Sequence, residues 1–369
     1  MKKILGIVSY TFLPATTGGH KAIASMYQSL SRFCSVVVIG TKTNDAEKAR
    51  GYRMIDILSN SPLRYINPFN FFTIRALISK EKPDYLQIEH PYLGWLAVLL
   101  KKFSGIKLIV RSHNIEGLRF KDLGKWWWKM LLSYEGWVHR KADINYFISE
   151  TDKVYAVGNF RLSPSACYTI TYGVNFTSPP SIRLRESAKD FLIREHLLDK
   201  SDTIILFNGA FGYGPNARAL SNLINNIFPL IYSITRESFK LIICGKDIPA
   251  ILIENNVDKN IIFAGFVADI NTYLTGASIF VNPITEGGGI KTKLVEALAF
   301  NVTCVSFKTG ALGVPQEVCG EKLVLADDND FEAFAEAIVA AKQTKEDIPS
   351  AFYKEFANEK IVEKMKSIL

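Results

Sequence analysis

The chain of 369 residues contains few of the residues that cross-link a protein or hold a structural metal. Its five cysteines are odd in number, lie far apart in apolar surroundings, and have neither disulfide nor zinc spacing. This pattern excludes a disulfide-stapled secreted domain and a zinc module, and it favours a reducing compartment. The cysteines are Cys34, Cys167, Cys244, Cys304 and Cys319.

Long hydrophobic runs are absent too. No apolar stretch approaches the ~20 residues that a membrane-spanning helix needs. Residues 1–15, MKKILGIVSYTFLPA, have the lysines and the apolar run of a secretory signal, but Ser9 and Tyr10 interrupt that run and Gly18-Gly19 follow it. A first buried strand explains the segment better than a cleaved signal. We therefore expect a cytoplasmic protein that is at most peripheral on the inner face of a membrane.

Negative charge is scarce in the first half of the chain. The formal net charge is +8, but residues 1–175 hold 24 Lys+Arg and 12 Asp+Glu, whereas residues 176–369 hold 20 and 24. All five tryptophans also lie in the first half. A basic, aromatic-rich half predicts anionic partners such as a membrane surface or a phospholipid-like acceptor. The basic residues are spread among expected core segments rather than along one exposed stretch, so we expect no nucleic-acid partner.

What the sequence does contain is a repeated alternation of buried strand and helix. Continuous apolar strands separated by helices predict a parallel sheet covered on both faces. A connector with Pro179 and Pro180 interrupts the alternation, which restarts near Thr203. We therefore expect an α/β protein with two Rossmann-like, doubly wound domains facing a central cleft, where ligands of such sheets bind. The predicted strands are 4–12, 35–39, 85–88, 107–110, 144–148, 168–171, 203–207, 241–243, 260–263, 278–281, 303–305 and 322–325.

The most informative segment is VNPITEGGGIKTKLVEALA, residues 281–299. It predicts a buried strand, a loop of three glycines, and a helix that carries two lysines and a glutamate. The glycines let the backbone approach a ligand closely and expose N–H groups at a helix start, where the helix dipole and the lysines add positive charge. This combination fits a diphosphate, and the alternative is a flexible turn before a surface helix. The residues concerned are Gly287, Gly288, Gly289, Lys291, Lys293 and Glu296.

Six further segments of the chain carry short motifs. They are Gly18-Gly19, RSHNIEGLRF (111–120), ISETDK (148–153), YGVNF (172–176), GAFGYGPN (209–216) and AGFV (264–267). With EGGGIKTKLVEAL (286–298), they resemble the retaining glycosyltransferases of family 4 (group 1) over nearly the whole chain. The resemblance implies the two-domain GT-B fold, with an acceptor-binding domain over 1–175 and a nucleotide-sugar donor-binding domain over 176–350. It also implies that a last helix, 351–369, packs back on the first domain.

The same resemblance implies roles for the residues that match these motifs. Gly18 and Gly19 would sit near the donor phosphates and the transferred sugar, and His113 would reach that sugar or support the catalytic region. Phe266 and Val267 would pack on the nucleobase and bond to it through the backbone. The lysines of the glycine-rich segment would neutralise the departing diphosphate, and its glutamate would hold the ribose. The other expected donor contacts are Gly209, Phe211, Gly287, Gly288, Gly289, Lys291, Lys293 and Glu296.

The chain departs from the family's pattern in its acidic residues. Many members have two glutamates separated by seven residues, and here Gly288 occupies the first of these positions. Glu286 could replace the missing glutamate from a shifted loop, or the sugar contact could come from the N–H groups of Gly288 and Gly289.

A second departure concerns an arginine. The family's arginine at the start of the second domain is missing, since Ala210 and Phe211 follow Gly209, and Lys291 could substitute for it. The candidate catalytic residues are therefore His113, Glu286 and Lys291.

Several polar residues have two interpretations. His20 is either a helix-start residue or an acceptor contact, and Asn114 is a further candidate for the acceptor site. Glu116 either caps the following helix or contacts the acceptor. Ser149 is expected to cap the next helix, with Asp152 at its third position.

The acidic run 327–330 raises the question of a metal. Because it precedes an expected helix, capping and dipole compensation explain it better than a metal site. We expect no metal requirement and no cofactor besides the nucleotide-sugar co-substrate. A P-loop is excluded, because no glycine directly precedes a Lys-Ser/Thr pair at the required spacing.

An aromatic cluster, Lys125-Trp126-Trp127-Trp128-Lys129, precedes a further apolar stripe. On one continuous helix, Trp126, Trp127 and Met130 fall on a wide apolar face, which predicts core packing. Trp128 falls outside that face, and the neighbouring lysines make a membrane contact an alternative for it.

These observations predict a hexosyltransferase-type enzyme. Breaking the bond between a sugar and a nucleoside diphosphate develops negative charge on the leaving phosphate, which preorganised cations and N–H donors stabilise. We expect transfer with retention to a glycan or lipid-linked acceptor, in surface polysaccharide or lipopolysaccharide-type biosynthesis. Two alternatives remain, a sugar-nucleotide epimerase on the same fold and a non-catalytic nucleotide-sugar-binding protein.

Overall fold

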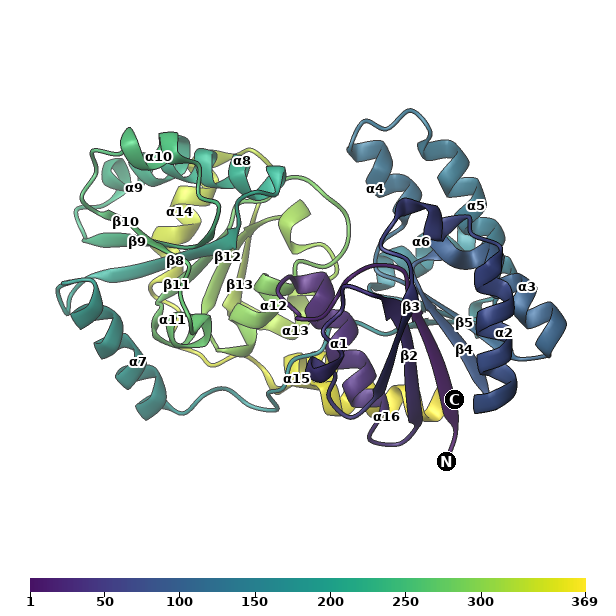
Figure 1. The fold of residues 1–369 in the computed structure, drawn as a ribbon. Coiled ribbons are helices and arrows are strands. Elements are labelled where there is room, and N and C mark those ends of the chain that lie inside the picture. Colours follow the sequence, from purple (N-terminus) through teal and green to yellow (C-terminus); the bar gives the residue numbers. More distant parts are fainter. The chain divides into compact units, whose positions relative to one another are not determined.

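The computed structural model describes residues 1–369 (Figure 1), and the chain divides into two compact units. Unit 1 comprises Met1–Gly173, Gly288–Ile290 and Asn358–Leu369, and unit 2 comprises Val174–Gly287 and Lys291–Ala357. Both units are built on parallel sheets with helices on the two faces, which is the predicted α/β class.

Unit 1 is a seven-stranded parallel sheet of order β3-β2-β1-β4-β5-β6-β7. Its central strands are buried on both faces, which explains why they are continuous apolar runs in the sequence. The strands are β1 (Lys3–Val8), β2 (Ser35–Thr41), β3 (Arg53–Leu58), β4 (Tyr85–Glu89), β5 (Lys107–Ser112), β6 (Ile144–Phe147) and β7 (Cys167–Thr169).

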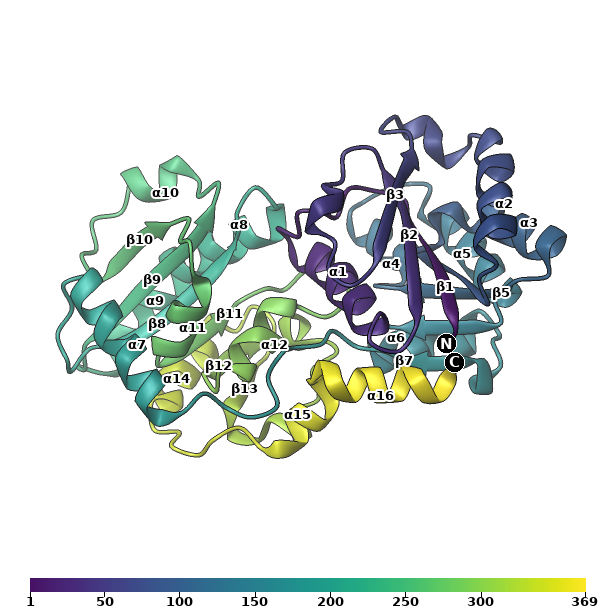
Figure 2. The ribbon, with the colours of Figure 1, turned by 60° about the horizontal axis from the view of Figure 1, so that its bottom comes forward.

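Helices cover both faces of this sheet (Figure 2). Side chains of α2, α3 and α5 pack on one face, and those of α1 and α16 pack on the other. The helices of unit 1 are α1 (Gly18–Leu30), α2 (Phe69–Glu81), α3 (Gly94–Ser104), α4 (Glu116–Asp122), α5 (Trp128–Lys141), α6 (Glu150–Asn159) and α16 (Asn358–Ile368).

Unit 2 is a six-stranded parallel sheet of order β10-β9-β8-β11-β12-β13. Its strands are β8 (Thr203–Ala210), β9 (Phe239–Lys246), β10 (Ile261–Gly265), β11 (Ile279–Asn282), β12 (Thr303–Phe307) and β13 (Leu323–Ala326). Its helices are α7 (Ile182–Glu195), α8 (Gly214–Asn222), α9 (Phe228–Ile234), α10 (Ala250–Glu254), α11 (Ile270–Gly276), α12 (Thr292–Ala299), α13 (Gln316–Cys319), α14 (Phe331–Ala341) and α15 (Ser350–Phe356). A π-helical turn, Leu223–Ile227, joins α8 to α9.

Three expectations about local structure need correction. The strand β3 was not predicted, because it lies at the sheet edge and carries Arg53 and Asp56 instead of a continuous apolar run. The expected helix over 351–369 is two helices separated by Ala357, and only the second, α16, belongs to unit 1. There Asn358 bonds Ser25 of α1, with 3.2 Å between Nδ2 and Oγ.

The third correction concerns the tryptophan cluster. The helix α5 begins only at Trp128, so Trp126 lies in the preceding turn and is not on the predicted helical stripe. Trp126 is 84% exposed and Met130 is 69% exposed, whereas Trp127 is half-buried. Trp128 is half-buried, with the ammonium groups of Lys121 and Lys129 5.2 and 5.6 Å from its ring.

Candidate active site

The polar side chains of unit 1 gather where its strands end. Glu89 closes β4, and Arg111 lies opposite it on β5, where the two residues are register partners. His90 and His113 follow these strands directly, at the carboxyl edge of the sheet, where ligands of open α/β sheets bind. His90 has a φ of 63°, which is uncommon outside glycine and is typical of functional sites.

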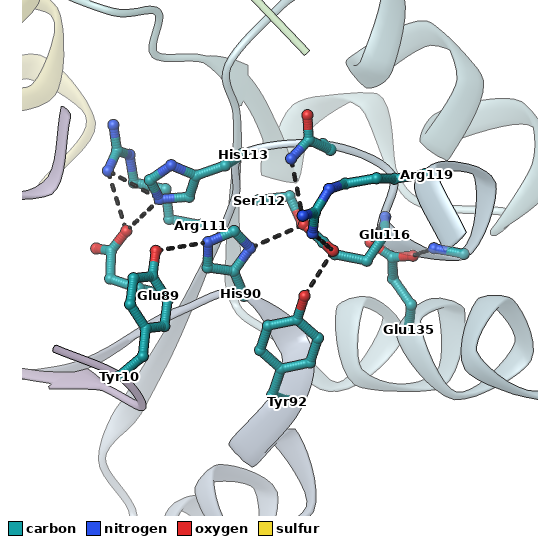
Figure 3. Close-up of polar contacts among 12 residues, drawn as sticks. Tyr10, Glu89, His90, Tyr92, Arg111, Ser112, His113, Glu116, Arg119 and Glu135 are labelled. Atoms are coloured by element: carbon teal, nitrogen blue, oxygen red, sulfur yellow. Dashed lines mark hydrogen bonds and ion pairs between the residues drawn. The ribbon is translucent and has the colours of Figure 1, made fainter. Parts of the chain in front are cut away.

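Glu89, Arg111 and His113 form a buried cluster (Figure 3). Arg111 Nη1 donates to Glu89 Oε2 at 3.0 Å, and His113 Nε2 lies 2.7 Å from the same oxygen. Burial and the Arg111 charge lower the pKa of His113 to about 3, so the imidazole is neutral. Burial would raise the pKa of Glu89, but Arg111 and the hydrogen bond from His113 outweigh it and hold that pKa at about 2.

This network assigns the tautomer of His113. Nε2 lies 3.2 Å from the donor Arg111 Nη1 but closer, 2.7 Å, to the ionised carboxylate of Glu89, so we assign the Nε2–H to Glu89, which leaves the Nδ1 lone pair as a hydrogen-bond acceptor. Nδ1 makes no hydrogen bond within the chain and is not among the enclosed unpaired atoms. His113 can therefore accept a hydrogen bond from a hydroxyl group of a bound sugar.

A second network surrounds His90. Figure 3 shows its ring between the Tyr10 hydroxyl, 3.0 Å from Nε2, and the Glu116 carboxylate, 3.1 Å from Nδ1. The ring also stacks on His113 with 4.3 Å between centroids. Tyr92 donates its hydroxyl hydrogen to Glu116 at 2.6 Å. His90 therefore links Tyr10, His113 and Glu116.

Glu116 itself does not cap its helix. It is the first residue of α4, and its fully buried carboxylate accepts from Asn114 at 3.2 Å and from Arg119 at 2.9 Å. Burial opposes ionisation, but the hydrogen bond from His90 and the charge of Arg119 lower the pKa of Glu116. The helix start is capped instead by Glu135 of α5, which accepts the N–H groups of Glu116 and Gly117, both at 3.0 Å.

The predicted glycines Gly18 and Gly19 open α1. Thr17 caps this helix by accepting the N–H of His20 at 3.4 Å. A Cβ on Gly19 would meet no atom within 4 Å, so the backbone there is open to a ligand. His20 lies beside Tyr10, with 6.2 Å between ring centroids, and its Nδ1 is enclosed without a hydrogen-bond partner. His20, His113, Asn114 and Glu116 therefore lie around one connected network.

The glycine-rich segment forms the predicted strand, loop and helix; its strand and helix belong to unit 2, whereas Gly288–Ile290 of the loop belong to unit 1. Gly287 has a φ of 83° and Gly289 a φ of 70°, values that side chains rarely tolerate. The helix α12 starts without a side-chain cap; the N–H of Leu294 bonds the carbonyl of Lys291 at 2.9 Å, which leaves the N–H groups of Thr292 and Lys293 as the donors at the helix start. Lys291 precedes the helix, and its ammonium donates to the carbonyl of Gly287 at 2.6 Å.

Lys293 is the most distinctive residue of unit 2. Its ammonium donates to the carbonyl of Asn208 and to Oδ1 of Asn216, both at 3.2 Å, and lies 4.5 Å from the centre of the Phe207 ring. No carboxylate pairs with it. Desolvation and the charge of Lys291 lower the pKa of Lys293 to about 7. Glu296 is half-buried one helical turn further along α12, on the same side as Lys293.

Glu286 is tied to a residue that the sequence analysis missed. Arg218 of α8 donates two hydrogen bonds to the carboxylate of Glu286, from Nε to Oε1 at 2.8 Å and from Nη2 to Oε2. A guanidinium can make the same pair of hydrogen bonds to a phosphate as to a carboxylate.

The two phenylalanines predicted for the donor site differ in their exposure to solvent. Phe211 is only 3% exposed and packs on Phe207 inside the core, and its role in the donor site stays a prediction. Phe266 is 68% exposed after β10, and Lys246 lies 4.4 Å from its ring centre. Val267 beside it is half-buried.

Gly209 is the next-to-last residue of β8 and lies opposite Gly245 of β9. A Cβ on Gly245 would lie 1.8 Å from the carbonyl oxygen of Gly209, so glycine is required there.

The capping interpretations are confirmed. Asp330 caps α14 by accepting the N–H of Ala333 at 3.0 Å, and Asp328 accepts the N–H of Thr309 at 3.0 Å. Ser149 caps α6 by accepting the N–H of Asp152 at 3.1 Å.

With this geometry established, the chain can be compared with known proteins. The family model described as Glycosyltransferase Family 4 matches residues 17–178, and the model described as Glycosyl transferases group 1 matches residues 202–343. No curated protein matches the chain by sequence.

Solved structures share the fold at low sequence identity. Sucrose-phosphate synthase from Thermosynechococcus elongatus is 15% identical, with a TM-score of 0.75 and coverage of 100% of this chain and 98% of that one. Anabaena HepE in complex with UDP-glucose is 13% identical, with a TM-score of 0.70 and coverage of 100% of both chains. The UDP-GlcNAc 2-epimerase from Methanocaldococcus jannaschii is 15% identical, with a TM-score of 0.62 and coverage of 99% of both chains.

The two family models leave only residues 1–16, 179–201 and 344–369 unmatched. The chain is therefore a glycosyltransferase of group 1 and family 4, built on the GT-B fold.

Proposed function

We propose that this glycosyltransferase moves a hexose from a nucleoside diphosphate sugar to a glycan or lipid-linked acceptor, with retention and without a metal. The observation that carries the proposal is the ammonium of Lys293, which has no carboxylate partner and lies on the helix that follows the glycine-rich loop. An unpaired, desolvated cation there lacks the negative charge that a diphosphate would bring.

Unit 2 offers what the departing nucleotide needs. Lys291 and Lys293 would neutralise the charge that develops on the leaving diphosphate, and the start of α12 would add N–H donors. Glu296 would accept hydrogen bonds from the ribose, and the exposed ring of Phe266 would stack on the base. Arg218 is positioned to exchange part of its contact with Glu286 for a phosphate.

Unit 1 offers what the sugar and the acceptor need. The neutral ring of His113 would accept a hydrogen bond from a sugar hydroxyl and so orient the sugar. The network of His90, Asn114 and Glu116, with the nearby His20, would bind hydroxyl groups of the acceptor. The excess of Lys+Arg in residues 1–175 supports an acceptor that is anionic or held at an anionic membrane surface, as in surface polysaccharide or lipopolysaccharide-type biosynthesis. None of the helices is long and apolar enough to span a membrane.

The test is calorimetric titration with UDP, GDP, ADP, CMP and dTDP, without added metal and again with Mg²⁺. Tight binding of one nucleotide without metal is the expected result, and it names the sugars to assay for transfer. NMR of the product then reports whether the anomeric configuration is retained. Failure of all five nucleotides to bind under either condition would contradict the proposal.

Product analysis separates the remaining alternatives. An epimerase, which the shared fold of the archaeal enzyme keeps open, converts the donor sugar without needing an acceptor. A non-catalytic binder gives neither transfer nor slow donor hydrolysis. Release of the nucleoside diphosphate that depends on an acceptor supports transfer.

Phe266→Ala is expected to weaken nucleotide binding about tenfold or more, because stacking of a base on an aromatic ring contributes roughly 1–3 kcal/mol. The melting temperature should not change, since the ring is largely exposed. Titration of the matched variant Phe191→Ala, on α7, gives the control. Equal nucleotide affinities of the two variants would show that the base does not stack on Phe266.

Glu296→Ala is expected to lower donor affinity roughly tenfold to a hundredfold, because charged hydrogen bonds contribute about 1.5–3 kcal/mol. The effect should be largest with ribonucleotides and small with a 2′,3′-dideoxy analogue, which lacks the hydroxyls. A similar loss for both ligands would mean that Glu296 does not hold the ribose.

A further inference from the structure

The outer side of unit 1 exposes an unusual set of large apolar side chains. They come from the 3₁₀ turn Pro62–Tyr65, from α2 and its approach, and from α3, and they are 37–72% exposed. We call this surface the α2–α3 face; its residues are Leu63, Ile66, Phe69, Phe72, Leu99 and Phe103.

The helix α2 is apolar on two opposite sides. Ile74 and Ile78 are one turn apart and face the sheet, where they are buried. Phe69 and Phe72 lie on the opposite side and are 72% and 66% exposed. A surface helix normally carries polar residues there, and contiguous exposed apolar patches mark sites of interaction.

Ring contacts make the patch continuous between the two helices. Phe71 of α2 lies 5.5 Å from the ring of Phe72 and 5.6 Å from that of Phe103 on α3. The Arg75 guanidinium lies 6.0 Å from the rings of Phe71 and Phe103, and Lys102 lies 5.9 Å from Phe103. Cations thus border the aromatic cluster.

Carboxylates are absent from this surface. The sequence contains no Asp or Glu between Asp56 and Glu81, and none in Gly94–Ser104. Glu81, at the far end of α2, is already paired with Lys3 and Arg53. The α2–α3 face therefore combines exposed phenylalanines with uncompensated positive charge, which is the composition of helices that lie at a membrane interface.

We propose that the α2–α3 face docks the protein on an anionic phospholipid surface. Phe69 and Phe72 enter the boundary between headgroups and acyl chains, while Arg75 and Lys102 contact headgroup phosphates. A second copy of the chain fits less well, because a two-fold contact would oppose the same cations without a carboxylate to pair them. The inference rests on the proposed function, because the membrane is where the enzyme would bind a lipid-linked acceptor.

The test is co-sedimentation with vesicles of phosphatidylglycerol and phosphatidylcholine in equal parts, with neither donor nor acceptor present. The wild-type protein should bind these vesicles and not pure phosphatidylcholine, and binding should weaken as NaCl rises from about 0.1 to about 0.5 M. Phe69→Ser/Phe72→Ser should need at least about tenfold more lipid for half-binding, and Arg75→Gln about fivefold more. Trp126→Ser/Met130→Ser removes two exposed apolar side chains of unit 1 outside the α2–α3 face and should bind like the wild type.

Each alternative outcome overturns the inference. Loss of binding only in the Trp126/Met130 variant would move the contact to the turn before α5. Equal binding by all variants would show that general positive charge suffices. A dimer that Phe69→Ser/Phe72→Ser dissociates, without vesicle binding by the wild type, would assign the face to a second copy. Titration of the same variants, without vesicles, with the nucleotide that the wild type binds distinguishes these results from a failure of the glycosyltransferase proposal.

Discussion

Lys293→Met is expected to lower kcat/KM for the donor about 10²–10³-fold, which is the usual effect of removing one preorganised charge from a leaving group. Methionine keeps an apolar stem that can pack on Phe207, so the loss is confined to the ammonium. Stability should change little, because no carboxylate loses a partner and the relieved desolvation of the ammonium offsets the loss of its hydrogen bonds to Asn208 and Asn216. Steady-state kinetics with the nucleotide sugar identified by titration measure the effect, and Lys259→Met on an exposed loop is the matched control.

The same lysine predicts a proton uptake on binding. In the free protein the pKa of Lys293 is about 7, so near pH 8 most molecules carry the neutral amine. A bound diphosphate stabilises the ammonium, and the complex must therefore take up close to one proton at that pH. Affinity should fall as pH rises above 7. Calorimetry in buffers of different ionisation enthalpy measures the uptake, and an unchanged uptake in Lys293→Met would assign it to another group.

The glycine-rich loop was predictable from the sequence because its determinants are local. Gly287 and Gly289 adopt φ values that other residues avoid, and Lys293 and Glu296 are one helical turn apart. Spacing alone therefore places these groups together. Position in a motif does not show whether a ring turns toward a ligand or the core, and the ring of Phe211 packs on Phe207 in the core.

The network of unit 1 depends on contacts between distant segments. Glu89 and Arg111 read in the sequence as the polar ends of two buried strands, and only the register of β4 with β5 brings them together. The cap of α4 likewise comes from Glu135, which lies on the next helix and not in the residues before α4. Sequence patterns therefore predicted His113 as a site residue but not the contacts with Glu89 and Arg111 that position it.

Glu89→Gln is expected to destabilise unit 1 by roughly 3–5 kcal/mol, because it leaves the buried guanidinium of Arg111 without its carboxylate. All five tryptophans lie between Trp95 and Trp137, so urea denaturation followed by tryptophan fluorescence reports unit 1 specifically. The double variant Glu89→Gln/Arg111→Met should recover a large part of the lost stability, since it removes both charges.

The pH dependence of this stability has a definite sign. The folded-state pKa of Glu89 is about 2, below the usual value of a glutamate, so its contribution is present above about pH 4.5 and is lost as pH falls toward 2. Glu89→Gln should therefore flatten the acid limb of the stability curve. A variant as stable as the wild type at neutral pH, with an unchanged acid limb, would mean that the cluster is not ionised as its geometry indicates.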